Sequence, residues 1–223
     1  VLRTSFAEHM PQTARFFDRG TIFDQHFSVL EYTYPSLPTI ETGMYPQHTG
    51  VFSEWAAIEL GEDITTIAER ARDAGYATAS LMGDGIGIYN GVTRGYDRLL
   101  VSPCRTLAYE AVERTIRCLD GCRDADHFML LHVNDVHPWN GESSQISAPA
   151  QMCLRLPGRV SVPKDPASSP YLRPCEFYQE AFWQAVHDTD RALGMLFDYL
   201  ERNYAPEDYL VNLYSDHGVA IFS

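Results

Sequence analysis

Long apolar runs and basic residues are both scarce in this sequence. No stretch of 18 or more apolar residues occurs among its 223 residues, which excludes a membrane-spanning helix within this stretch. Lys and Arg number 17 against 30 Asp and Glu, which gives a formal charge of -13. Because proteins hold nucleic acids through Lys and Arg contacts to phosphate, this balance argues against nucleic acid as a partner. The acidic balance fits an enzyme that binds cations.

Cysteine is the other sparse residue. The five cysteines are odd in number and have no paired Cys-x-x-Cys spacing, so no cysteine zinc motif is present. Cys118 and Cys122 are one helical turn apart, which is typical of two core or surface positions rather than a metal pair. No targeting signal can be recognised either, so the sequence leaves the cellular compartment unknown.

Apolar residues make up 45% of the chain, enough for one substantial core, so we expect a single α/β domain over residues 1–223. Helical periodicity followed by a short apolar run occurs three times, which predicts a mostly parallel sheet in a three-layer α/β/α sandwich. The three units pair helix 63–74 with strand 76–82, helix 106–119 with strand 127–133, and helix 175–202 with strand 209–214.

Shorter elements are expected near the N-terminus and a long loop in the middle. The pattern predicts a helix over 11–20, a strand over 21–27 and a helix over 36–43. Residues 138–174 are rich in Pro, Ser and Gly and have no period, so they are interpreted as a long irregular insertion.

Polar residues follow two of the predicted strands. Asp216 and His217 end strand 209–214, and the segment from Asn134 to His137 follows strand 127–133. Parallel strands place such residues at one edge of the sheet, and Asp with neutral His suits a divalent ion such as Zn²⁺ or Mn²⁺. An ordinary strand-to-turn junction is the alternative interpretation of Asp-His-Gly.

Six segments, taken in chain order, resemble motifs of the sulfatase family in the alkaline phosphatase superfamily. The family patterns are "TPNLDRLAxEGxxF", "PSRAxLxTGxYPxxHGV", "LAExLKxAGYxTA", "DPHxPY", "DxxLGxLLxxL" and "TSDHG". The corresponding segments are residues 10–23, 35–51, 67–79, 135–139, 188–194 and 215–218.

The resemblance implies roles for four residues. The family nucleophile lies two residues before the Pro of its "CxPSR" element, which corresponds to Thr33. Asp216 and His217 match metal ligands, with Thr33 facing the same ion, and His137 matches a histidine that contacts the substrate anion or the leaving group. The implied cofactor is a divalent metal ion, Ca²⁺, Mn²⁺ or Zn²⁺. The implied substrate is a sulfate or phosphate ester of a small molecule, glycan or lipid-linked group.

The segment around Thr33 departs from the sulfatase pattern. Sulfatases convert Cys or Ser to formylglycine, and the converting machinery requires an Arg where this chain has Leu37. Thr cannot become that aldehyde, so formylglycine chemistry is not expected. Thr nucleophiles occur in nucleotide pyrophosphatase/phosphodiesterases and lipoteichoic-acid-type phosphoglycerol transferases, and Thr33 therefore favours phosphoryl transfer.

The N-terminus departs as well. The family's first strand ends in metal-binding aspartates, but no Asp precedes Pro11, where Glu8 and His9 are the only candidate ligands. The family also continues beyond its "TSDHG" element. We therefore interpret the chain as a fragment that lacks the first strand and the C-terminal part, and we expect weak or no activity from it alone. A non-catalytic domain that binds an anionic ligand or partner is the alternative.

Simpler interpretations apply to several of these residues. Thr33 could cap the helix entered at Pro35, and Ser36 is either a competing hydroxyl or a cap. His48 is either a loop residue or a neighbour of the site, and His132 is expected to face the sheet packing.

Overall fold

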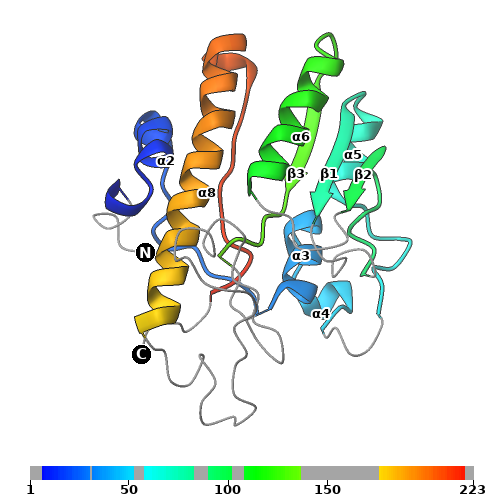
Figure 1. Ribbon diagram of the computed structural model, residues 1–223. Coiled ribbons are helices and arrows are strands. Elements are labelled where there is room, and N and C mark those ends of the chain that lie inside the picture. Colours follow the sequence, from blue (N-terminus) through cyan, green and yellow to red (C-terminus); the bar gives the residue numbers. More distant parts are fainter. Residues whose placement is uncertain are drawn as a thin grey trace.

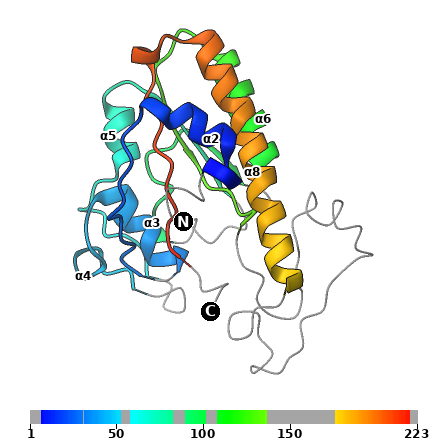
Figure 2. The ribbon, with the colours of Figure 1, turned by 90° about the vertical axis from the view of Figure 1, so that its left-hand side faces the viewer.

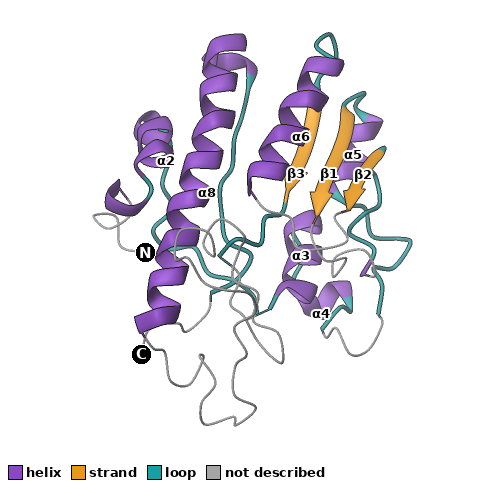
Figure 3. Cartoon of the chain, in the orientation of Figure 1, coloured by secondary structure: helices purple, strands orange, loops and turns teal. Residues whose placement is uncertain are grey.

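A three-stranded parallel sheet forms the centre of the computed structural model, which describes residues 7–30, 32–52, 58–82, 90–101, 108–136 and 176–218. The strands are β1 (Ala77–Met82), β2 (Arg98–Val101) and β3 (His127–Leu131), in the order β2-β1-β3. Ala79 of β1 lies opposite Arg98 of β2 and Met129 of β3. Helices α6 (Ala108–Gly121) and α8 (Glu176–Asn203) cover one face and α5 (Ile67–Asp73) the other, so the predicted α/β layering is confirmed (Figures 1, 2 and 3).

The central strand β1 is buried from Thr78 to Met82. A strand with helices on both faces has no solvent side, so small and apolar residues fill every position of it. It carries two buried hydroxyls. The Thr78 hydroxyl donates to the Gly95 carbonyl at 2.7 Å and accepts from the Asp97 amide at 2.9 Å, whereas the Ser80 hydroxyl has no hydrogen-bond partner among the described residues.

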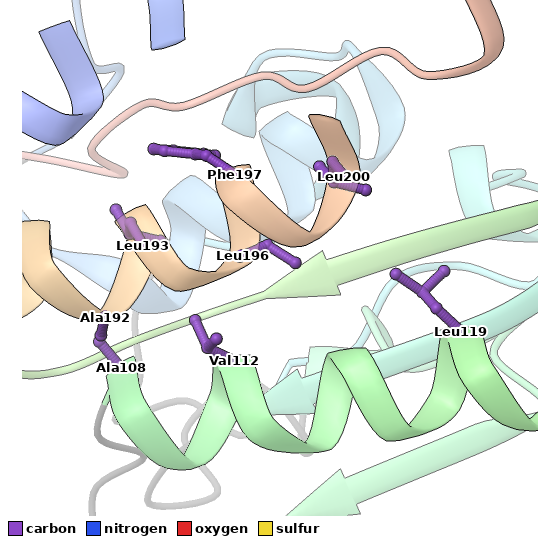
Figure 4. Close-up of a cluster of buried hydrophobic side chains, with 8 residues drawn as sticks. All are labelled: Ala108, Val112, Leu119, Ala192, Leu193, Leu196, Phe197 and Leu200. Carbon is purple, nitrogen blue, oxygen red and sulfur yellow. The ribbon is translucent and has the colours of Figure 1, made fainter. Parts of the chain in front are cut away.

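The main apolar core lies between α6 and α8 (Figure 4). The stripes of both helices meet here, as the 3.6-residue period requires. The core consists of eight buried side chains: Ala108, Val112, Leu119, Ala192, Leu193, Leu196, Phe197 and Leu200. Phe16 stacks on Phe197 with ring centroids 4.1 Å apart, which brings the N-terminal helix onto this core.

Helix α2 (Pro11–Phe16) is fixed to α8 by one buried carboxylate. Asp190 accepts from the backbone amides of Gln12 and Thr13 at 3.0 and 2.8 Å, and from the Thr13 hydroxyl at 2.7 Å. The first amides of a helix have no partner within the helix, so Asp190 satisfies them from a distant part of the chain. Helix α2 continues into the short 3-10 helix η1 (Phe17–Arg19).

Helix α3 (Thr33–Thr42) lies beyond the arrowheads of the strands, next to α4 (Pro46–Thr49) (Figure 1). It ends at Gly43, whose φ of 68° is the left-handed conformation that glycine adopts without strain. Helix α5 begins with a capping box in which Thr66 and Glu69 satisfy each other's backbone amides.

Several predicted elements differ from those observed. The helix expected over 36–43 begins three residues earlier, and β2 and α4 were not predicted. No strand forms at 21–27, where every side chain is exposed, or at 209–214, where Leu210 is 86% exposed. Tyr209 and Val211 pack on the α6/α8 core, but the segment makes no sheet ladder within the described part of the chain. The 3-10 helix η5 (Pro206–Asp208) leads into it. The insertion predicted at 138–174 lies outside the described residues.

Candidate active site

Thr33 and His217 meet at the edge of the sheet where the strands end. Thr33 is the first residue of α3 and is 6% exposed, and His217 follows the extended segment 209–215. The Thr33 Oγ1 and the His217 Nε2 lie 3.1 Å apart although 184 residues separate them in sequence. The structure therefore joins two residues that the sequence placed in separate motifs.

The His217 ring is oriented by a second contact. Its Nδ1 lies 3.1 Å from the Gly218 carbonyl oxygen, which can only accept a hydrogen bond. This contact places the ring proton on Nδ1 and leaves a lone pair on Nε2, which faces Thr33. His217 is therefore prepared to accept the Thr33 hydroxyl proton or to bind a cation through Nε2.

Asp216 adds a partly buried carboxylate to the pair. Its Oδ2 lies 3.5 Å from the His217 Nε2 and 3.9 Å from the His132 Nε2. The same oxygen is buried and accepts no hydrogen bond. The backbone carbonyl of Asp216 accepts from the Ser28 hydroxyl at 2.8 Å, which holds this turn in place. His132 thus faces the site, and the expectation that it packs within the sheet was wrong.

These donor atoms fit part of a divalent-ion site. Ligand bonds of about 2.0–2.2 Å place neighbouring ligand atoms roughly 3 to 3.5 Å apart, which the Thr33, His217 and Asp216 atoms match. A buried carboxylate oxygen without a partner is costly unless something positive faces it. Among the described residues, however, no group of three or more His, Cys, Asp or Glu side chains forms a ready metal cluster. The set is compatible with a metal ion and incomplete.

Glu41 and Tyr214 both have raised pKa values. Glu41 of α3 is buried, and burial raises its pKa to about 7 even though the Tyr96 hydroxyl donates to its Oε1 at 2.8 Å. Burial, with the nearby charges of Glu41 and Asp216, raises the pKa of Tyr214 to about 12.

Asp135 has a structural role in the described residues. Its Oδ2 accepts from the Ala108 amide at 2.7 Å, so it caps the start of α6. Burial, assisted by the charge of Asp188, raises the pKa of Asp135 to about 6. His137, the other predicted catalytic residue, lies outside the described residues, so its position relative to Thr33 is not described.

The remaining candidates lie away from Thr33 or have other roles. Tyr32, not Thr33, is the N-cap of α3, and the Ser36 hydroxyl donates to the Tyr32 carbonyl at 3.0 Å within the helix. Neither hydroxyl therefore caps the helix. His48 is exposed on α4, and His9 stacks against Trp183. No local pattern marks His132 as a site residue, because only the return of segment 209–216 beside β3 brings it to Asp216.

The sequence profile of one protein family matches nearly the whole chain, including these residues. The profile named Sulfatase matches residues 4–223. The chain belongs to the sulfatase family. Membership agrees with the parallel sheet, its flanking helices and the polar residues at the strand ends. No curated protein matches the sequence significantly. None of the described helices is long and apolar enough to cross a membrane.

Solved structures share the sulfatase fold at low sequence identity. A phosphonate monoester hydrolase of Agrobacterium radiobacter aligns with a TM-score of 0.59 at 16% identity, over 86% of this chain and 54% of its own. A Bacteroides thetaiotaomicron protein of glycosaminoglycan metabolism gives 0.62 at 14%, over 87% and 51%. A protein solved with its substrate D-glucosamine-2-N,6-O-disulfate gives 0.56 at 17%, over 86% and 57%. The chain spans about half the length of these structures.

Proposed function

We propose that this sulfatase-family domain is part of a metal-dependent enzyme that cleaves or transfers a phosphate or sulfate ester, with Thr33 as the nucleophile. The observation that carries the proposal is the 3.1 Å approach of the Thr33 Oγ1 to the His217 Nε2. Two polar groups from distant parts of the chain, both largely buried, contact each other where open α/β sheets bind ligands.

Four residues of the chain have proposed roles in this reaction. The Thr33 hydroxyl attacks the phosphorus or sulfur atom, the bond from that atom to the ester oxygen breaks, and the leaving oxygen takes up a proton from solvent. Without an ion, the Thr33 proton moves to the His217 Nε2. Asp216, His217 and Thr33 are the residues that would hold a divalent ion, which would occupy the His217 Nε2 and activate the Thr33 hydroxyl in its place. Such an ion would lower the energy of the developing negative charge on the attacking and transferred oxygens. His137 would contact the transferred group or the leaving oxygen, as the family resemblance implies.

Thr33 favours phosphoryl over sulfuryl transfer within this proposal. A threonine hydroxyl is a competent nucleophile once a neighbouring base or cation activates it, but it cannot supply the aldehyde hydrate that sulfatases use. Leu37, where the sulfatase pattern has Arg, is 2% exposed and packs in the apolar cluster with Tyr34 and Val51. An apolar contact replaces the charge that the aldehyde-forming machinery requires.

The test is a comparison of three ester classes with the longest protein that contains this chain. An aryl sulfate, a phosphate monoester and a phosphodiester are each assayed with added Mn²⁺, Zn²⁺ or Ca²⁺. Thr33→Ala is expected to lower kcat/KM by roughly 10³-fold or more, because nucleophiles act as a unit with their activating partners. Thr39→Ala is the matched control, since its hydroxyl donates only to the Pro35 carbonyl of the same helix.

The outcomes separate the proposal from its rivals. Full activity of Thr33→Ala would contradict the nucleophile, and activity on the sulfate alone would contradict the phosphoryl preference. Binding of an anionic ester without turnover of any of the three would support the non-catalytic alternative.

A further inference from the structure

We propose that His9 and His187 form a second metal site, separate from Thr33 and Asp216, which takes a borderline divalent ion such as Zn²⁺, Ni²⁺ or Cu²⁺. His9 lies in the helical turn 7–9, and His187 lies on an exposed position of α8. The His9 Nδ1 and the His187 Nε2 are 3.4 Å apart, although 178 residues separate them. The inference does not depend on the proposed function.

The distance between the two nitrogens is the first argument. Two imidazole nitrogens bound to one tetrahedral ion at about 2.0–2.1 Å lie about 3.4 Å from each other. The same separation is at the long end of a hydrogen bond between the rings, in which one nitrogen must donate. An ion that replaces this shared proton would keep the separation of the two nitrogens and would require the two rings, whose centroids are 5.7 Å apart, to tilt toward it.

The orientation of the His9 ring is the second argument. It stacks on Trp183 with centroids 3.9 Å apart and an interplanar angle of 23°. Trp183 and His187 are one helical turn apart on α8, so they present neighbouring side chains on one side of that helix. The rings of His9 and His187 are nearly parallel and meet edge to edge, with centroids 5.7 Å apart and an interplanar angle of 20°. Trp183 is thus a positioning residue that holds one ligand beside the other.

The donor chemistry decides the class of ion. Neutral imidazole nitrogens bind Zn²⁺, Ni²⁺ and Cu²⁺, whereas Ca²⁺ and Mg²⁺ require oxygen ligands. His187 is exposed, so water can fill the remaining coordination positions. The formal charge of -13 attracts cations to the chain as a whole. An ion bound here would link the N-terminal turn to α8.

The test measures Zn²⁺ binding by titration calorimetry in the Asp216→Ala, His217→Ala double variant, which lacks two proposed ligands of the other site. One Zn²⁺ per chain is expected. Adding His187→Gln to this double variant is expected to weaken Zn²⁺ binding by at least about tenfold. Even changes to residues that only contact a metal ligand lower metal affinity by roughly 10- to 100-fold. His26→Gln and His48→Gln, at exposed histidines elsewhere, are matched controls that should leave the affinity unchanged.

A second measurement covers variants that fail to fold. In a chain with Trp55→Phe and Trp139→Phe, which leaves Trp183 as the source of tryptophan fluorescence, added Cu²⁺ should quench that fluorescence. His9→Gln should reduce the quenching while the metal-free circular dichroism stays the same. Equal Zn²⁺ affinity in the presence and absence of His187→Gln would overturn the proposal, as would quenching that His9→Gln does not change. Loss of activity in Thr33→Ala has no bearing on this result, so the two proposals fail separately.

Discussion

The junction of α2 with α8 and the contact of Thr33 with His217 differ in how many hydrogen-bond donors their aspartate has. Each joins residues more than 170 positions apart in the sequence and includes an aspartate, Asp190 at the junction and Asp216 beside His217. Asp190 at the helix junction has three donors, two backbone amides and a hydroxyl. Asp216 at the site has a buried oxygen with no donor. The satisfied carboxylate stabilises the fold, and the unsatisfied one is available to a ligand.

Removing the satisfied carboxylate should have the largest effect. Asp190→Ala leaves two amides and a hydroxyl without their acceptor, and we expect the free energy of unfolding to fall by about 4 kcal/mol. The control is Asp198→Ala, also on α8, whose 2.7 Å ion pair with Arg15 is exposed. Exposed pairs contribute about 1 kcal/mol or less. Equal losses in urea unfolding would mean that Asp190 does not fix α2.

Glu41 lies between the two cases, because Tyr96 donates to its Oε1 while its Oε2 has no partner. Burial raises its pKa from 4.5 to about 7, so the folded chain binds a proton more tightly than the unfolded chain does. Stability is therefore fully present below pH 4.5 and falls as the pH rises to about 7, by about 3 kcal/mol from this group.

The measurement for Glu41 is a difference between two pH profiles. Asp135, with a pKa of about 6, titrates in part of the same range, so only the difference between Glu41→Gln and the unmodified chain isolates Glu41. Glu41→Gln should make the decline in thermal stability between pH 4.5 and 7 smaller and leave the part that comes from Asp135. Glu201→Gln, at an exposed residue, should leave the profile unchanged. Parallel profiles for all three proteins would show that Glu41 does not titrate in this range.

The substitution Asp216→Asn tests the carboxylate whose Oδ2 has no hydrogen-bond donor. It removes the charge of a partly buried carboxylate whose Oδ2 has no hydrogen-bond donor, so the metal-free chain should be as stable as before or more so. Divalent-ion affinity should fall by roughly 100-fold, or about 2.7 kcal/mol. Asp124→Asn, at an exposed residue, is the control. A large loss of metal-free stability would show that Asp216 is structural, like Asp190.

Local patterns predicted most of the helices and the two strands that lie between them. Residues 127–131 and 77–82 form strands within a residue or two of the prediction, because an apolar run bounded by turn residues is a local signal. The strands expected over 21–27 and 209–214 did not form, since a strand also needs a neighbour with which to pair, and alternation along the chain does not supply one. The side chains of Leu210 and Phe23 are accordingly 86% and 77% exposed instead of packed within a sheet.

Only part of the candidate site, likewise, could be predicted from the sequence. Motif resemblance selected Thr33, Asp216 and His217 as candidates, and the structure brings them together although segment 209–214 is not a strand of the described sheet. His132 and the Gly218 contact were missed, because neither has a local pattern that separates it from ordinary packing. Asp190 was assigned to a family motif, but its role as the cap of α2 is visible only where α8 passes the start of that helix.

The sequence by itself determined the family, the layered α/β architecture and the residue types at the strand ends, since periodicity and motif spacing are properties of short segments. The tertiary structure alone decided which buried carboxylates are satisfied. A carboxylate's partners come from segments far away in the chain, as Asp190 and Asp216 demonstrate. Hydrogen-bond satisfaction depends on distances of a few tenths of an ångström between such segments, and no local pattern encodes those distances.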